Sequence, residues 1–261
     1  MADRNACILA VAGKGGVGKT SVAACMVRLL SHTYPDKKIL AIDADPAVGL
    51  STALGIEPSL TVDDIRESVV DHVEKGETKA ALEILSDARC GIFDALVERE
   101  GFSFLAVGRP ESAGCYCKVN AYLKEVISHL SQAFDYVVID GEAGIEQINR
   151  RVMEKVTHLF LITDASKKGT QVIQTIDRVS KRLDMADAAY AIANRLPLEN
   201  GRIPDFIREN MDTGEIPVLT YIPSDPALSR FDILGEDVTT LPEEAPIVRG
   251  VREALEKSGI L

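Results

Sequence analysis

Short runs of apolar residues alternate along the chain with longer segments of mixed polarity. Most of these runs are continuously apolar, which is typical of strands that are covered on both faces. Strands are predicted at seven places: 6–12, 38–42, 102–107, 136–140, 158–163, 188–193 and 217–222. Strands that alternate with helices predict an α/β fold, a three-layer structure in which helices cover both faces of a mainly parallel sheet.

Helix-compatible segments fill most of the chain between the strands. Helices are predicted over 19–32, 61–73, 117–133, 146–156, 168–183 and 244–257. Residues 61–100 are more polar than the rest and mostly helical, so we interpret them as an insertion on the core. No stretch has the composition of a linker, and residues 1–261 are therefore expected to form a single domain.

Composition narrows the class of protein. The chain has 261 residues, of which 46% are hydrophobic, and its apolar runs are far shorter than a membrane span. Residues 1–5 carry no basic segment before a long apolar stretch, so we expect no signal peptide and a cytoplasmic protein. A net charge of −11 opposes binding to nucleic acid and to anionic membranes, and we expect neither as a partner.

The most specific pattern follows the first predicted strand. Residues 13–20 read Gly-Lys-Gly-Gly-Val-Gly-Lys-Thr and fit the phosphate-loop pattern G-x-x-x-x-G-K-[ST]. Its glycines let backbone N–H groups turn toward phosphate oxygens, and the following helix adds its own free N–H groups. We expect Lys19 to reach the β- and γ-phosphates of ATP and the Thr20 hydroxyl to hold Mg²⁺. The predicted ATP- or ADP-binding residues of the loop are Gly13, Lys14, Gly15, Gly16, Val17, Gly18, Lys19, Thr20 and Ser21.

The second lysine of the loop, Lys14, is not required by the general pattern. A loop of the form G-K-G-G-x-G-K-T resembles the deviant Walker A loop of the MinD, ParA and nitrogenase iron protein superfamily. In that superfamily the extra lysine reaches across a dimer interface to the partner's nucleotide. The resemblance implies a P-loop NTPase fold of that type and an ATP-dependent homodimer in which Lys14 and Lys19 are catalytic. The alternative is that Lys14 is a solvated loop residue.

Two predicted strands end in acids at the edge where open α/β sheets bind ligands. Asp43 and Asp45 follow the second strand in a segment that resembles switch I of the superfamily. The resemblance implies that Asp45 orients the attacking water and that Asp43 helps to hold the Mg²⁺ shell. Both could instead be ordinary turn residues.

Asp140 ends the strand 136–140, which has the Walker B form. We expect its carboxylate to bond the Thr20 hydroxyl or a metal-bound water. The spacing to Gly144 resembles switch II, in which a glycine N–H senses the γ-phosphate. Glu142 departs from the small residue usual at its position, and its role is open.

Two further segments concern the nucleotide base. Asn194 and Arg195 end another predicted strand, and this dipeptide resembles an adenine contact of the superfamily, since an Asn amide can pair with a purine. Pro223 and Asp225 lie in a segment that resembles the base-binding loop of the nitrogenase iron protein. An ordinary turn is the alternative for these two residues.

The chain has five cysteines, and two of them form a pair. Cys7 and Cys25 lie in apolar segments and are expected to pack, whereas the role of Cys90 is open. Cys115 and Cys117 form a C-x-C segment between a strand and a helix, and both thiols can point at one ion if the chain is extended there. Two thiolates leave the shell of Zn²⁺ or Ni²⁺ incomplete, and a two-fold axis that brings two such pairs together would supply four sulfurs. The four histidines are scattered and are not expected to act as ligands: His32, His72, His129 and His158.

This combination resembles the CooC-type nickel-insertion ATPases, which are accessory to carbon monoxide dehydrogenase, and their relatives that serve acetyl-CoA synthase. The resemblance covers nearly the whole chain and rests on the phosphate loop, the G-C-Y-C segment and the stretch Asp140–Arg151. It implies a Mg-ATP-dependent homodimer that binds Ni²⁺, or Zn²⁺ in its place, through Cys115 and Cys117, with a nickel enzyme as its client.

Two alternatives stay open. One is an ATP-dependent electron donor like the nitrogenase iron protein, although that family spaces its cluster cysteines far apart. The other is a MinD- or ParA-type positioning ATPase. Its membrane-binding form uses a basic amphipathic helix at the C-terminus, whereas residues 247–257 are mixed in charge and poor in large apolar residues.

Overall fold

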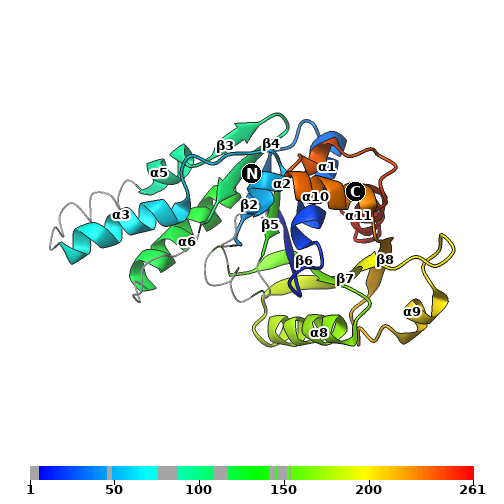
Figure 1. The fold of residues 1–261 in the computed structure, drawn as a ribbon. Helices are drawn as coiled ribbons and strands as arrows, with labels where there is room; N and C mark the ends of the chain where they lie inside the picture. The colour runs from blue at the N-terminus through cyan, green and yellow to red at the C-terminus, as the bar shows by residue number, and fades with distance from the viewer. Residues whose placement is uncertain are drawn as a thin grey trace.

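The computed structural model describes residues 6–45, 49–75, 88–108, 117–141 and 154–261, together with positions 145, 148 and 152. Within these residues, eight strands form one sheet in the order β3-β4-β2-β5-β1-β6-β7-β8 (Figure 1). Neighbouring strands run parallel throughout, except for the antiparallel pair β3 and β4 at one edge. The predicted α/β fold with a mainly parallel sheet is confirmed.

The strands are β1 (Cys7–Gly13), β2 (Ile39–Asp43), β3 (Val97–Arg99), β4 (Phe102–Ala106), β5 (Tyr136–Asp140), β6 (Val156–Thr163), β7 (Ala186–Leu196) and β8 (Val218–Pro223). The helices are α1 (Lys19–Thr33), α2 (Gly49–Ala53), α3 (Val62–Glu74), α5 (Ala88–Asp94), α6 (Cys117–Ser131), α8 (Lys167–Arg182), α9 (Asp205–Asn210), α10 (Pro226–Leu234) and α11 (Pro246–Lys257), with a 3-10 turn at Val238–Thr240. All seven predicted strands are present, with β5 at its predicted bounds and the ends of the others shifted by up to three residues.

The predicted helix 146–156 falls largely outside the described residues, and its end is wrong. Val156 opens strand β6 and pairs with Ala186 of β7, so the preceding residues 154–155 are not helical. Five elements had no counterpart in the prediction: β3, α2, α9, α10 and the 3-10 turn, while α5 lies in the segment 61–100 that was expected to be mostly helical. Each is shorter than the stretch over which apolar periodicity becomes recognisable.

Each face of the sheet has its own hydrophobic core. Along β1, Leu9 and Val11 pack on one side, and Ala10 and Ala12 pack on the other, because successive residues of a strand point to opposite faces. The first core joins α1 and α11 to the sheet, and the second joins α3, α6 and α8 (Figure 1). The carboxyl ends of the parallel strands lie together at one edge of the sheet. This edge carries the site described next.

Within the described residues, no helix is long and apolar enough to cross a membrane.

Candidate functional site

The phosphate loop lies where β1 turns into α1, at the carboxyl edge of the sheet. Gly13 has a φ of 144°, and a Cβ at this position would lie 2.1 Å from the carbonyl oxygen of Ile162 on β6. Gly18, the residue before α1, has a φ of 88°. A Cβ on Gly15 or Gly16 would meet no atom within 4 Å. Position 13 therefore requires glycine, because a side chain there would collide with β6. The space beside Gly15 and Gly16 is open.

A pocket of about 510 Å³ lies against this loop. The pocket is bounded by the loop and the first turn of α1 on one side and by α2 and α10 on the others. Its lining includes Gly15, Gly16, Gly18, Lys19, Thr20, Ser21, Asp45, Gly49, Thr52, Arg195, Phe231, Asp232, Gly235 and Glu236. The pocket thus brings together the predicted loop residues with Asp45 and Arg195, which are distant in sequence.

Two buried carboxyl groups, those of Asp43 and Asp140, lie at the same edge of the sheet as the phosphate loop. Asp43 accepts hydrogen bonds from the backbone N–H groups of Leu50 (2.8 Å) and Asp45 (3.2 Å). Among the described residues, neither carboxylate oxygen of Asp140 accepts a hydrogen bond of good geometry, although the Thr20 hydroxyl lies close enough to lower its pKa. The pKa of Asp43 is raised to about 6 and that of Asp140 to about 7, mainly by burial, and the charge of Asp43 contributes to the rise at Asp140.

A fully buried carboxylate group whose two oxygens lack a geometrically good hydrogen bond fits a bound cation. Thr20 and Lys19 lie close enough to Asp140 to oppose part of the rise in its pKa. A hydroxyl and two carboxylates are oxygen ligands of the kind that Mg²⁺ prefers. The donor set of Thr20, Asp43 and Asp140 therefore fits the predicted Mg²⁺ site.

Lys14 is bound within its own chain. Its Nζ donates to Oδ2 of Asp164 at 2.7 Å and to the Ser166 hydroxyl at 3.4 Å. Asp164 follows β6, and Ser166 caps the N-terminus of α8 by accepting from the N–H of Gly169. Burial acts to raise the pKa of Asp164, but the hydrogen bonds from Lys14 and Ser166 hold it below its usual value.

Sequence reasoning missed Asp164, although a signal was available. Asp164 follows a predicted strand at the same sheet edge as Asp43 and Asp140. The packing below it is tight, since a Cβ on Gly169 would lie 2.3 Å from Oδ1 of Asp164.

Asn194 and Arg195 both hold the phosphate loop. Asn194 is 1% exposed, and its Nδ2 donates to the carbonyl oxygen of Val17 at 2.8 Å. Arg195, at a φ of 55°, donates to the carbonyl oxygen of Gly16 at 3.0 Å and pairs with Asp232 at 3.0 Å. Asp232 on α10 is a second residue of the site that the sequence analysis did not single out. Asn194 and Arg195 therefore support the phosphate loop from the side of β7.

The two predicted base contacts on β8 and after it have local structural roles. Pro223 ends β8 beside Leu196 of β7. Asp225 is the N-cap of α10, where its Oδ1 accepts from the N–H of Ala227 at 2.9 Å. Neither residue lines the pocket at the loop. Asp225 therefore has a local capping role, and its predicted contact with the nucleotide base stays a prediction.

The predicted C-x-C site lies mostly outside the described residues. Cys115 is not described, and Cys117 is described only as the first residue of α6. Glu142 and Gly144 also lie outside. In the part of the chain that is described, no three His, Cys, Asp or Glu side chains come together as a metal site.

The remaining cysteines are free thiols. Cys25 is fully buried in α1, and this burial raises the pKa of its thiol to about 12. Cys7 is half-buried, and burial raises its thiol pKa as well. Both findings confirm the prediction that these two side chains pack. Cys90 is exposed.

A glycine loop between β1 and α1, with acids at the ends of adjacent strands, defines a P-loop nucleotide-binding protein. Residues 8–238 match the family model of the CobQ/CobB/MinD/ParA nucleotide binding domain, and the chain belongs to this family. It is a P-loop ATPase. The superfamily indicated by the deviant Walker A loop is thereby confirmed.

Two relatives match this chain over most of its length and of their own. The chain is 36% identical over 251 residues to an uncharacterized ATP-binding protein of Methanocaldococcus jannaschii, and the match covers 96% of this chain and 97% of the relative. It is 29% identical over 238 residues to the carbon monoxide dehydrogenase accessory protein CooC of Rhodospirillum rubrum, with 87% of each chain covered.

A solved structure has the same fold. The septum site-determining protein MinD of Pyrococcus horikoshii, complexed with Mg-ADP, superposes with a TM-score of 0.69 at 22% identity and covers 97% of this chain and 96% of its own. At this identity the likeness concerns the fold alone.

Proposed function

We propose that this protein is a Mg-ATP-dependent homodimer that binds one Ni²⁺ through Cys115 and Cys117 at its dimer interface and assists nickel insertion into a client enzyme. Carbon monoxide dehydrogenase and acetyl-CoA synthase are the expected clients. The observation that carries the proposal is a C-x-C pair, ending at the first residue of α6, in a P-loop ATPase that is 29% identical to CooC. Zn²⁺ is the expected substitute, since thiolates bind both ions.

The phosphate loop and the acids at the sheet edge divide the nucleotide chemistry between them. The backbone of Gly13–Ser21 and the Nζ of Lys19 bind the phosphates, while Thr20, Asp43 and Asp140 would hold Mg²⁺. That ion, when bound, neutralises charge on the β- and γ-phosphates. Asp45, which lines the pocket, orients a water molecule whose oxygen attacks the γ-phosphorus, and the bond to the bridging oxygen breaks to leave ADP and phosphate.

Lys14 has to change partners to act in this scheme. It is 2.7 Å from Asp164 of its own chain, and in the proposed dimer it leaves this carboxylate for the phosphates of the other subunit. Asp164 and the phosphates both attract the same ammonium group, so the ion pair in one chain competes with the contact between chains.

The base site and the overall organisation complete the proposal. We expect Asn194 and Arg195 to contact the adenine and Pro223 and Asp225 to complete the base site. Residues 1–261 act as one P-loop ATPase domain. Strands β1 to β8 all belong to one sheet, and the last helix, α11, packs against the first, α1. We place the protein in the cytoplasm, where its client enzymes would be assembled.

Metal analysis tests the cysteine site directly. Protein loaded with NiCl₂ in the presence of a non-hydrolysable ATP analogue should hold one Ni²⁺ per two chains. The double variant Cys115→Ala with Cys117→Ala should lose this nickel and keep its affinity for ATP, whereas Cys90→Ala, which removes an exposed thiol, should retain the nickel. Unchanged nickel stoichiometry in the double variant would refute the metal site.

The two alternatives make different predictions for the same preparation. An electron donor like the nitrogenase iron protein would be brown and contain iron after anaerobic purification. A positioning ATPase would co-sediment with lipid vesicles or DNA in the presence of ATP. We expect neither result, given the net charge of −11 and the close spacing of the cysteines.

A further inference from the structure

Helix α10 forms one wall of the nucleotide pocket and carries an acid into it. Asp232 of this helix lines the pocket at the phosphate loop, together with Phe231 and the following Gly235. Its Oδ2 accepts from the guanidinium of Arg195 at 3.0 Å. The carboxylate therefore lies among the groups that are expected to bind the nucleotide.

The two side chains that face Asp232 both belong to the candidate nucleotide site. Arg195 donates to Asp232 with one nitrogen and to the carbonyl oxygen of Gly16 with another. Burial raises the pKa of Asp232, and the charge of Arg195 and the side chain of Ser21 both oppose this rise. Carboxylates and phosphates accept hydrogen bonds from the same kinds of donor. The side chain of Asp232 therefore takes up groups that a nucleotide would use.

The charge of the pocket also opposes a nucleotide. Among the described residues, three acids line the pocket, and two bases do: Asp45, Asp232 and Glu236 against Lys19 and Arg195. The phosphates of a nucleotide are negative, and like charges at short range repel each other. Asp232 contributes to this repulsion and also neutralises one of the two bases.

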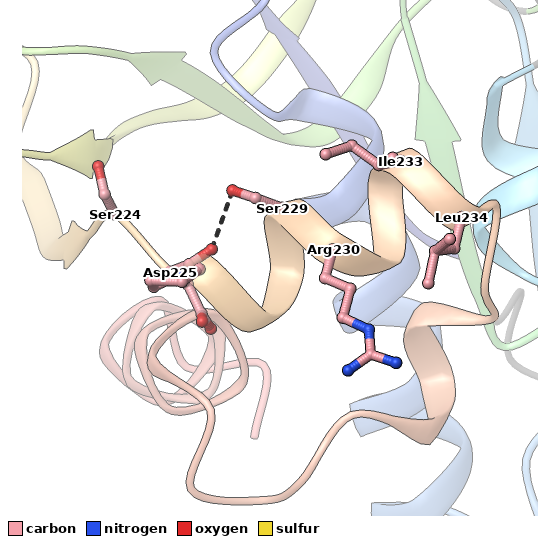
Figure 2. Close-up of a pocket in the computed structure, with 7 residues that line it drawn as sticks. Ser224, Asp225, Ser229, Arg230, Ile233 and Leu234 are labelled. Carbon is pink, nitrogen blue, oxygen red and sulfur yellow. Dashed lines mark hydrogen bonds between the residues drawn. The ribbon is translucent and has the colours of Figure 1, made fainter.

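Helix α10 is attached loosely enough for this acid to withdraw. Of its nine residues only Leu228 is buried, and Ile233 is 83% exposed. Arg230, Ile233 and Leu234 line a separate groove on the other side of the helix (Figure 2). The helix ends at Gly235, which has a left-handed φ of 65°. A shift of this helix away from the pocket would therefore expose little additional apolar surface.

We propose that Asp232 limits the affinity of the pocket for nucleotide, because an entering nucleotide has to displace its carboxylate from Arg195 and Ser21. This inference rests on the proposed binding of phosphates by the loop, and it is independent of the proposed dimer and metal site. The opposite role for Asp232 is to orient Arg195 toward the nucleotide. The two roles predict changes of opposite sign in affinity when the carboxylate is removed.

Isothermal titration calorimetry with Mg-ADP distinguishes these roles. Asp232→Asn keeps the shape of the side chain and removes its charge. Glu236→Gln is the matched control, because Glu236 lines the same pocket, whereas the ion pair of Arg195 is with Asp232. Thermal denaturation without nucleotide checks that each variant is folded.

Asp232→Asn should bind Mg-ADP about three- to tenfold more tightly than the wild type, because the competing ion pair and one repulsive charge are both removed. Glu236→Gln should gain less than about twofold, since it removes only a repulsive charge. In an Arg195→Gln background, Asp232→Asn should gain less than it does in the wild type, because the two residues act through one contact.

Three results would count against the inference. If Asp232→Asn binds ADP as tightly as the wild type or more weakly, the carboxylate does not compete with nucleotide and the inference is wrong. If Glu236→Gln gains as much as Asp232→Asn, the effect belongs to the general charge of the pocket and the inference is also wrong. If Lys19→Ala binds ADP as tightly as the wild type, the proposed role of the loop fails and the inference fails with it. If Lys19→Ala binds ADP at least about tenfold more weakly, the loop assignment stands, and the result for Asp232→Asn decides the inference alone.

Discussion

Asp43 and Asp140 stand opposite each other on the neighbouring strands β2 and β5, and neither is exposed to solvent. Their position at the ends of adjacent parallel strands follows directly from the strand order. Each carboxyl group resists ionisation because it is buried, and the charge of Asp43 adds to the cost of ionising Asp140. A divalent cation at this edge would remove that cost.

The first prediction concerns pH and stability in nucleotide-free protein with EDTA. Both carboxyls have folded-state pKa values, about 6 and about 7, above the ordinary value of 3.8. The folded state therefore binds more protons than the unfolded state between about pH 4 and pH 7, so stability falls as the pH rises through this range. Asp140→Asn should be more stable than the wild type at pH 8 by about 1–3 kcal/mol, with a much smaller difference at pH 4.

Urea denaturation at the two pH values measures this difference. Asp36→Asn, at an exposed position, is the control and should follow the wild type at both. If Asp140→Asn were destabilised equally at pH 4 and pH 8, the buried carboxylate would not be the source of the pH dependence.

Lys19 is the second residue to test. It is 9% exposed and lines the pocket at the phosphate loop. Lys19→Ala removes the charge expected on the β- and γ-phosphates, and phosphate release should fall by at least about 100-fold. Lys37→Ala, which removes a surface pair with Asp135, should hydrolyse ATP at the wild-type rate. Full activity in Lys19→Ala would refute the assignment of the loop.

The ion pair with Asp164 is expected to limit the availability of Lys14 for the proposed dimer. The pair is about 70% buried on each side, and ion pairs of modest exposure contribute about 0.5–1 kcal/mol. Asp164→Asn should therefore tighten ATP-dependent dimerisation by about two- to fivefold, because the lysine no longer gives up this partner. Sedimentation velocity over a range of concentrations measures the change.

Lys14→Ala should weaken the ATP-dependent dimer, both in the wild type and in the Asp164→Asn variant. Dimerisation that is weaker in Asp164→Asn than in the wild type would show that the ion pair supports the dimer instead of competing with it.

Asn194 supports the loop through one buried hydrogen bond. Asn194→Ala leaves the carbonyl oxygen of Val17 without its donor, which should lower the free energy of unfolding by about 1–3 kcal/mol and weaken ADP binding. Asn210→Ala is a close control, since that side chain makes a similar bond to the carbonyl oxygen of Phe206 on the surface. Calorimetry on the two variants should show an effect only for Asn194→Ala.

Local patterns in the sequence were enough to predict the sheet, the phosphate loop and the acids at the strand ends. The loop is contiguous, and Asp43 and Asp140 each follow an apolar run, so no knowledge of tertiary structure was needed. The roles that were missed depend on which strands are neighbours. Asp164 reaches Lys14 because β6 lies beside β1, a pairing across about 150 residues that no local pattern encodes.

Asn194 illustrates a different limit. The sequence placed Asn194 near the end of a strand. The hydrogen bond from its amide to the carbonyl oxygen of Val17, however, depends on how the phosphate loop packs against β7. Helix α10 was missed because its nine residues bury only Leu228, which leaves no apolar periodicity to detect.

The central place of β1 has a consequence for the order in which this protein is made. The strand that leads into the phosphate loop is synthesised well before its hydrogen-bonded neighbours β5 and β6, which begin at Tyr136 and Val156. A nascent chain that stops short of β6 lacks one side of the cradle, including the Ile162 carbonyl against which Gly13 packs. We therefore expect nucleotide binding by a nascent chain only after the residues of β6 have been synthesised and paired with β1.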